Sequence, residues 1–91
     1  MTETVLPPDE SVQRICDLMM GMATALVDHP DQVRIETEHF DTETVLRLYV
    51  SSDDLGKLIG KQGRTARSLR TILGAAGSKI QRRFSLDVQS N

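Results

Sequence analysis

With 91 residues, the chain is long enough for one small domain and too short to enclose a deep active site. Its 38% hydrophobic and 26% charged residues are typical of a globular protein, and a single cysteine excludes an internal disulfide framework, which favours a reducing, cytoplasmic location. Residues 1–54 carry twelve acidic and three basic side chains, whereas residues 55–91 carry eight basic and one acidic. Only the second part therefore suits a polyanionic ligand. No apolar run reaches the length of a membrane span, and no signal peptide is predicted.

The chain begins with an aperiodic segment that ends in two prolines, so residues 1–8 are predicted to be a flexible tail and residues 9–91 a single domain. Asp9 is a candidate N-cap for a first helix that runs to about residue 27. Apolar residues recur there at steps of three and four, as they do on one face of an amphipathic helix. The stripe consists of Val12, Ile15, Cys16, Met19, Met22, Ala23, Leu26 and Val27.

Two strands and a short helix are predicted next. Residues 33–38 alternate between apolar and polar, residues 40–43 form a turn, and residues 46–50 alternate again, which indicates a β-hairpin. A short helix follows, with Ser51, Ser52 or Asp53 as its cap. Its apolar residues are Leu55, Leu58 and Ile59.

A longer helix and a third strand complete the pattern. The predicted buried side of this helix consists of Ala66, Leu69, Ile72, Leu73, Ala76 and Ile80. Gly74 and Gly77 leave its length open, because each glycine costs about 1 kcal/mol in a helix interior. Residues 84–88 then alternate as a strand. The expected fold is α+β, in the order helix–strand–strand–helix–helix–strand, with the helices packed on one face of a three-stranded sheet.

Two glycines separated by two residues, Gly60 and Gly63, interrupt the predicted helices. Such a loop turns tightly and brings backbone amides close to a ligand. The helix that follows adds N–H groups and the positive end of its dipole, which favour a phosphate. Several cations surround this point: Lys61, Arg64 and Arg67, with Lys57 expected nearby on the preceding helix. Lys79, Arg82 and Arg83 are interpreted as ordinary solvated charges.

The string Ile59-Gly60-Lys61-Gln62-Gly63, followed by Ala66 and Leu69, resembles the signature of the KH domain. The element order resembles the type II form of that fold, and the whole chain is similar to small stand-alone bacterial KH proteins of the KhpA type. The resemblance implies that the loop clamps the backbone of about four unpaired nucleotides. Carried onto this chain, it implies the following RNA-binding residues: Lys57, Ile59, Gly60, Lys61, Gln62, Gly63, Arg64 and Arg67.

Other site chemistries are weaker interpretations of the same residues. A nucleotide-binding P-loop needs four residues between its glycines and Ser or Thr after the lysine, but three residues separate Gly56 from Gly60, and Gln62 follows Lys61. Cys16 lies on the apolar stripe and is interpreted as core, and the two histidines lack the spacing of a metal site. We therefore expect no enzyme activity, metal, cofactor or small-molecule substrate.

The favoured hypothesis is a sequence-tolerant binder of single-stranded RNA that acts as an RNA chaperone or post-transcriptional regulator. A single groove with few phosphate contacts binds weakly, so useful affinity requires two domains that act together. The family resemblance suggests that the second domain comes from a homodimer or from a complex with a larger, multidomain KH-containing RNA-binding protein. The alternative is a protein–protein interaction module with a KH-like fold, which contacts its partner through the acidic first helix and hairpin. Single-stranded DNA remains open as a ligand, because the loop does not contact the sugar hydroxyl.

Overall fold

The computed structural model describes residues 8–91, so the predicted tail lies, except for Pro8, outside the described residues. Its elements follow in the predicted order: α1 (Pro8–Leu26), β1 (Arg34–His39), β2 (Glu43–Val50), α2 (Leu55–Ile59), α3 (Arg64–Lys79) and β3 (Arg83–Ser90). Two single turns of 3₁₀ helix, Pro30–Gln32 and Lys61–Gly63, lie between them.

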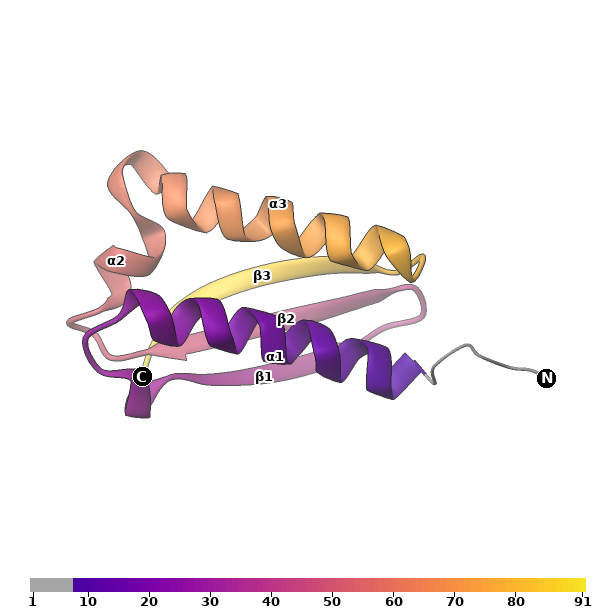
Figure 1. The fold of residues 1–91 in the computed structure, drawn as a ribbon, viewed down its shortest axis with the longest axis horizontal. Coiled ribbons are helices and arrows are strands. Elements are labelled where there is room, and N and C mark those ends of the chain that lie inside the picture. The colour runs from indigo at the N-terminus through magenta and orange to yellow at the C-terminus, as the bar shows by residue number, and fades with distance from the viewer. Residues whose placement is uncertain (1–7) are drawn as a thin grey trace.

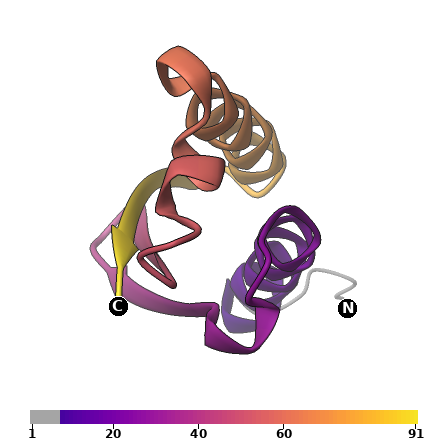
Figure 2. The ribbon, with the colours of Figure 1, turned by 90° about the vertical axis from the view of Figure 1, so that its left-hand side faces the viewer.

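The three strands form one sheet in the order β1-β2-β3, with β2 at its centre. β1 and β2 form the predicted antiparallel hairpin. β3 runs parallel to β2, which requires a crossover connection, and α2 with α3 provides it. α1 and α3 lie along the sheet in Figure 1, and Figure 2 shows them on the same side of it. The predicted fold class is confirmed.

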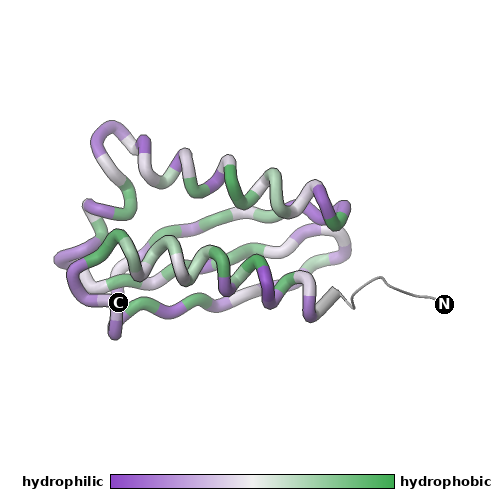
Figure 3. The backbone as a smooth tube through the Cα atoms, in the orientation of Figure 1, coloured by the Kyte–Doolittle hydropathy of each residue, from purple (hydrophilic) through white to green (hydrophobic). Residues whose placement is uncertain are grey.

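The core lies between the sheet and the helices. β2 alternates strictly, and its inward side chains Thr44, Leu46, Leu48 and Val50 are fully buried. The helices cover them with apolar side chains, chiefly Met19, Ala23, Leu58, Leu69 and Leu73. In Figure 3 hydrophobic positions recur along the strands and helices, whereas the loop between α2 and α3 is hydrophilic. That loop therefore lies outside the core.

Several predicted details of the helices are wrong. α1 begins at Pro8, so Asp9 lies inside the helix and is not its N-cap. Leu26, the last residue of α1, is 45% exposed and does not belong to the buried stripe. Ile72 is 42% exposed: the buried residues of α3 are Ala66, Leu69, Leu73 and Gly77, and Ile72 lies about 100° around the helix from Leu73.

α3 continues through both of its interior glycines. A Cβ on Gly77 would lie 2.5 Å from the Arg82 carbonyl oxygen and 2.5 Å from Cδ2 of Phe84, whereas nothing lies within 4 Å of a Cβ on Gly74. Gly77 therefore allows α3 to approach β3 closely. This packing benefit offsets the glycine's low helix propensity and explains why the helix does not end there.

The cap predicted for α2 is also wrong. The residue before α2 is Asp54, and it makes no side-chain bond to the helix that follows. Its fully buried carboxylate instead accepts the backbone N–H groups of Asp28 (3.0 Å) and His29 (2.9 Å). Burial raises the pKa of this carboxyl, but the two N–H donors, with His29 and Lys57 nearby, outweigh burial, so its pKa lies below the usual value. Asp54 thus fixes the end of α1 against the start of α2.

Arg82 fixes the opposite end of the molecule. Its guanidinium donates to the carbonyl oxygens of Phe40, Asp41 and Glu43 in the hairpin. Its Nε also donates to the buried Thr44 hydroxyl at 2.6 Å. Because these bonds occupy most of its donors, Arg82 holds the hairpin against the start of β3 and is not a free surface charge.

Candidate nucleic-acid interface

The loop between α2 and α3, residues 60–63, is a compact turn held by its own backbone. The Gly60 N–H donates to the Gly56 carbonyl at 2.8 Å and closes α2, and the Gly63 N–H donates to the Gly60 carbonyl at 3.0 Å. Gln62 (φ 57°) and Gly63 (φ 74°) then adopt left-handed conformations before α3 begins at Arg64. We call this segment the 60–63 loop.

The two glycines of this loop are required for different reasons. Gly60 has φ 78° and ψ 169°, a conformation that is essentially restricted to glycine. A Cβ there would lie 2.3 Å from the Thr65 hydroxyl and 2.7 Å from the Thr65 backbone nitrogen. Gly63 also has a positive φ, but nothing lies within 4 Å of its Cβ position. The backbone at Gly63 therefore adjoins open space that a ligand can occupy.

α3 begins without the groups that commonly neutralise a helix N-terminus. Gly63 offers no side-chain cap, and the first turn of α3 contains no acidic residue. The positive end of the helix dipole is therefore not compensated locally by a carboxylate. The surface formed by the 60–63 loop and the first turn of α3 favours an anion.

The cations predicted to surround the loop are exposed. The side chains of Lys61, Arg64 and Arg67 are exposed to solvent, and in the described part of the chain none of them forms a salt bridge. Arg64 Nη2 donates to the Gln62 side-chain oxygen at 3.1 Å, which links these two exposed side chains. Ile59, just before the loop, is 40% exposed and adds an apolar surface beside it.

Lys57 differs from the other predicted cations. It lies on α2, and its ammonium forms an ion pair of 3.2 Å with Asp28 at the end of α1. A carboxylate therefore already partly compensates its charge. The other seven predicted residues form one continuous stretch from Ile59 to Arg64, together with Arg67 one turn further along α3.

Sequence reasoning missed two residues of this region. Thr65 packs beneath Gly60 and fixes how close the loop lies to α3. Arg70 is exposed, and its Nε donates to the Leu86 carbonyl of β3 at 3.2 Å. The spacing of Arg67 and Arg70, three residues apart on a helix, is the sequence signal that places both on one face.

Two kinds of feature are absent from residues 8–91. No helix there combines the length and apolar character needed to cross a membrane. Nor do three histidine, cysteine or acidic side chains gather there at a spacing suited to a metal ion. Burial, and secondarily the neighbouring Asp17, raise the pKa of the Cys16 thiol, which disfavours its reactive thiolate form.

Residues 17–88 match the family model described as KhpA/KhpB, KH domain. The chain is 43% identical over 76 residues to the RNA-binding protein KhpA of Bacillus subtilis, an alignment that covers 84% of this chain and 94% of that protein. It is 51% identical over 72 residues to the RNA-binding protein KhpA of Halalkalibacterium halodurans, covering 78% and 93%. Among solved structures, Era in complex with MgGDPNP and a segment of 16S ribosomal RNA matches with a TM-score of 0.63 and 14% identity, over 99% of this chain and 35% of that one. The last likeness concerns the fold alone.

Proposed function

Because the chain belongs to the KhpA/KhpB family of KH domains, we propose that it binds single-stranded RNA through the 60–63 loop and the start of α3. The observation that carries the proposal is the double-glycine turn with exposed Lys61 and Gln62. It leads into a helix start without cap or carboxylate, beside Arg64 and Arg67, and within residues 8–91 neither these arginines nor Lys61 form a salt bridge. The similar proteins of Bacillus subtilis and Halalkalibacterium halodurans are named RNA-binding proteins, which supports the same ligand class. A loop of this kind holds the backbone of about four unpaired nucleotides.

Each residue of the proposed interface has a distinct part in binding. Gly60 and Gly63 keep the loop backbone free of side chains, so that the amides of Lys61 and Gln62 can approach the sugar–phosphate backbone. Arg64 and Arg67, together with Lys61, neutralise phosphates, and Arg can do so through two parallel hydrogen bonds. The bases rest against the apolar surface at Ile59. Lys57 contributes less, since Asp28 competes for its charge.

The double variant Lys61→Asp/Gln62→Asp tests the loop. It places two carboxylates where phosphates are expected, and Asp tolerates the left-handed backbone of residue 62 better than most residues do. We expect at least a tenfold loss of affinity for a uridine decamer in fluorescence anisotropy at low salt, about 1.4 kcal/mol, with an unchanged far-UV circular dichroism spectrum.

The matched control is Arg14→Asp/Gln32→Asp, which changes the formal charge by the same amount at two exposed positions outside the loop. It should retain RNA affinity within about twofold, since neither position lies in the 60–63 loop or in α3. Equal losses in both double variants would mean that net charge, not the loop, governs binding. If the parent protein itself shows no RNA binding at low salt, the interaction-module hypothesis replaces this proposal.

A single loop of this kind makes few phosphate contacts, so its affinity is weak and decreases as salt increases. We infer that function as an RNA chaperone or post-transcriptional regulator in the cytoplasm requires a second RNA-binding unit, either another copy of the chain or a larger KH-containing protein. Two linked units raise the effective concentration of the second contact without any new interaction. Sedimentation of the protein alone and with RNA distinguishes a dimer from a monomer. Competition between uridine and deoxyuridine decamers measures the preference for RNA over DNA.

A further inference from the structure

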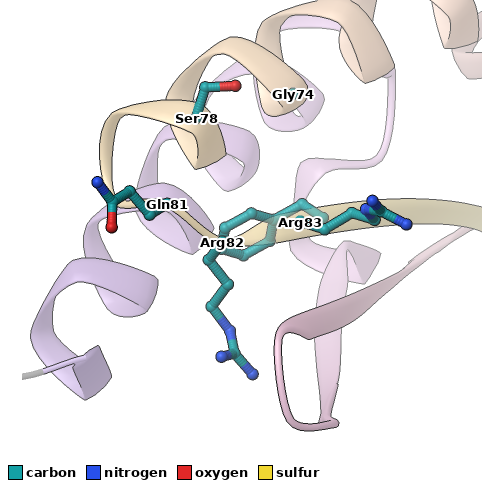
Figure 4. Close-up of a pocket in the computed structure, with 6 residues that line it drawn as sticks. Gly74, Ser78, Gln81, Arg82 and Arg83 are labelled. Atoms are coloured by element: carbon teal, nitrogen blue, oxygen red, sulfur yellow. The ribbon is translucent and has the colours of Figure 1, made fainter.

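A pocket of about 480 Å³ lies at the opposite end of α3 from the 60–63 loop. It is open to solvent where the last turns of α3 face the start of β3 (Figure 4). Its lining consists of Gly74, Ser78, Gln81, Arg82, Arg83 and Phe84. We call it the Arg83 pocket.

One face of α3 leads from the 60–63 loop to this pocket. Arg67, Arg70, Gly74 and Ser78 follow one another at steps of three and four residues, so they share a side of the helix. Arg70 donates to the Leu86 carbonyl, and Gly74 and Ser78 line the pocket together with residues of β3. This face therefore borders β3, which in the described sheet pairs only with β2 and has its other edge open.

The charges along this path are positive and available. Arg70 uses only its Nε in the bond to β3, which leaves the remaining guanidinium N–H groups free of described protein partners. Arg83 is exposed and forms no salt bridge within residues 8–91. The carboxylate of Glu43, its register partner on β2, accepts the hydroxyl of Ser85 at 2.6 Å instead. Arg82, in contrast, is occupied by the hairpin carbonyls.

The pocket itself offers room and polar groups. Nothing lies within 4 Å of a Cβ on Gly74, so the helix surface there is bare. Gln81 has a left-handed backbone (φ 56°) and lines the pocket together with Ser78; in Figure 4 the side chains of the two residues point in different directions. The Phe84 ring packs under Gly77 and provides an apolar wall.

We propose that the Arg83 pocket is a second RNA subsite, in which Arg83 binds a phosphate of a strand that continues from the 60–63 loop along the Arg67–Arg70 face of α3. The inference rests on the proposed function and extends it from about four nucleotides to a longer footprint. α3 has 16 residues and is about 24 Å long. Because the loop itself holds about four nucleotides, a strand needs further nucleotides to cover that length. A tetramer held by the loop therefore leaves none to reach Arg83, whereas a decamer has enough.

The test compares a uridine tetramer with a uridine decamer in NMR titrations of the ¹⁵N-labelled protein. The tetramer should shift the amide signals of the 60–63 loop and of Arg64, and leave those of Ser78 and Arg83 unchanged. The decamer should shift these and, in addition, the amide signals of Ser78 and Arg83. Arg83→Gln should weaken the decamer about threefold to fivefold and lower its salt slope by about 0.7, the loss of one phosphate contact, while the tetramer affinity stays the same.

Arg14→Gln is the control, because it removes one exposed positive charge from α1 and should change neither affinity. Equal weakening of tetramer and decamer by Arg83→Gln, or no weakening of either, would overturn the second subsite while leaving the loop proposal intact. If the tetramer shifts no loop amide at all, the proposed function itself fails, and the subsite fails with it.

Discussion

At the residue scale, the two glycines of the 60–63 loop have different physical requirements. Gly60 combines a glycine-restricted backbone conformation with the contact of Thr65 against the position of a Cβ. Gly63 has only a left-handed φ, and its Cβ direction is empty. Gly60 thus allows the loop to lie close to α3, and Gly63 leaves the loop backbone exposed.

Alanine substitutions separate these two requirements. Gly60→Ala should lower the free energy of unfolding by about 3 kcal/mol, because strain and overlap with Thr65 add. Gly63→Ala should cost about 1 kcal/mol, because only the left-handed conformation is penalised. Urea unfolding followed by circular dichroism measures both values.

Gly56→Ala serves as the matched control for these variants. Gly56 lies within α2, has no positive φ and has nothing within 4 Å of its Cβ position, so alanine should stabilise the protein slightly. If Gly60→Ala were no more destabilising than Gly63→Ala, the close contact between Gly60 and Thr65 would not exist in solution.

The carboxylate of Asp54 makes the stability of the protein depend on pH. Its pKa is lowered in the folded protein, so its contribution to stability is fully present above the unfolded value of about 3.9 and is lost as the pH falls through the folded pKa. Asp54→Asn should lower the melting temperature at pH 7. As the pH falls below 4, the variant should also lose less stability than the parent does, and thermal unfolding across the acid range measures this difference.

Asp53→Asn is the comparison variant for this experiment, since the Asp53 side chain is 82% exposed. It should unfold at nearly the parent temperature throughout, because its carboxylate is well solvated. If Asp53→Asn and Asp54→Asn had the same effect, the bonds from Asp54 to Asp28 and His29 would not contribute to stability.

At the scale of elements, the contact between α3 and β3 positions the proposed interface. Gly77 permits the approach of the two elements, and the Arg70 bond to Leu86 lies along the same border. The 60–63 loop is the N-terminal continuation of α3, so a change in the packing of α3 changes where the loop lies. The packing of the buried Gly77 therefore affects the position of the 60–63 loop at the other end of α3.

Gly77→Ala should destabilise the protein by about 2 kcal/mol, because its Cβ would overlap the Arg82 carbonyl and the Phe84 ring. Gly74→Ala, three residues earlier on the same helix, should instead stabilise it by about 0.8 kcal/mol, since that Cβ meets open space. Urea unfolding of the two variants measures the difference. Equal effects would contradict the close approach of α3 to β3.

At the scale of the whole molecule, the two halves of the chain use their charges differently. Two acidic residues of the hairpin are paired with arginines of the same hairpin, Glu36 with Arg34 and Glu38 with Arg47. The hydrogen bond that Arg47 donates to Glu38 raises the pKa of Arg47 above its usual value. The cations of α3 lack such partners among the described residues. A chain with a slightly negative net charge therefore still presents a positive surface.

The element order, the hairpin and the core stripe of β2 could be predicted from the sequence, because they depend on local periodicity. The roles of Asp54 and Arg82 could not. Asp54 bonds to residues 25 and 26 positions away, and Arg82 to the hairpin 38 to 42 positions away. Local patterns carry no information on such partners. For the same reason, Arg83 was interpreted as an ordinary solvated charge, although it lines a pocket at the end of α3.

The loop was the most predictable part of the candidate site. Two glycines between helices, followed by cations, already specify a bare turn at a helix start, and the structure adds the reasons for each glycine. The ion pair of Lys57 with Asp28 was not predictable, because it depends on where α1 ends relative to α2. Which residues contact RNA stays a prediction.

The most direct test of the 60–63 loop as a backbone cradle is the map of amide shifts when a uridine tetramer is added to the labelled protein at low salt. We predict that the largest shifts occur at Gly60, Lys61, Gln62, Gly63 and Arg64, and that they diminish as salt is raised. Shifts confined to α1 and the hairpin, with the loop amides unchanged, would contradict RNA binding through this loop.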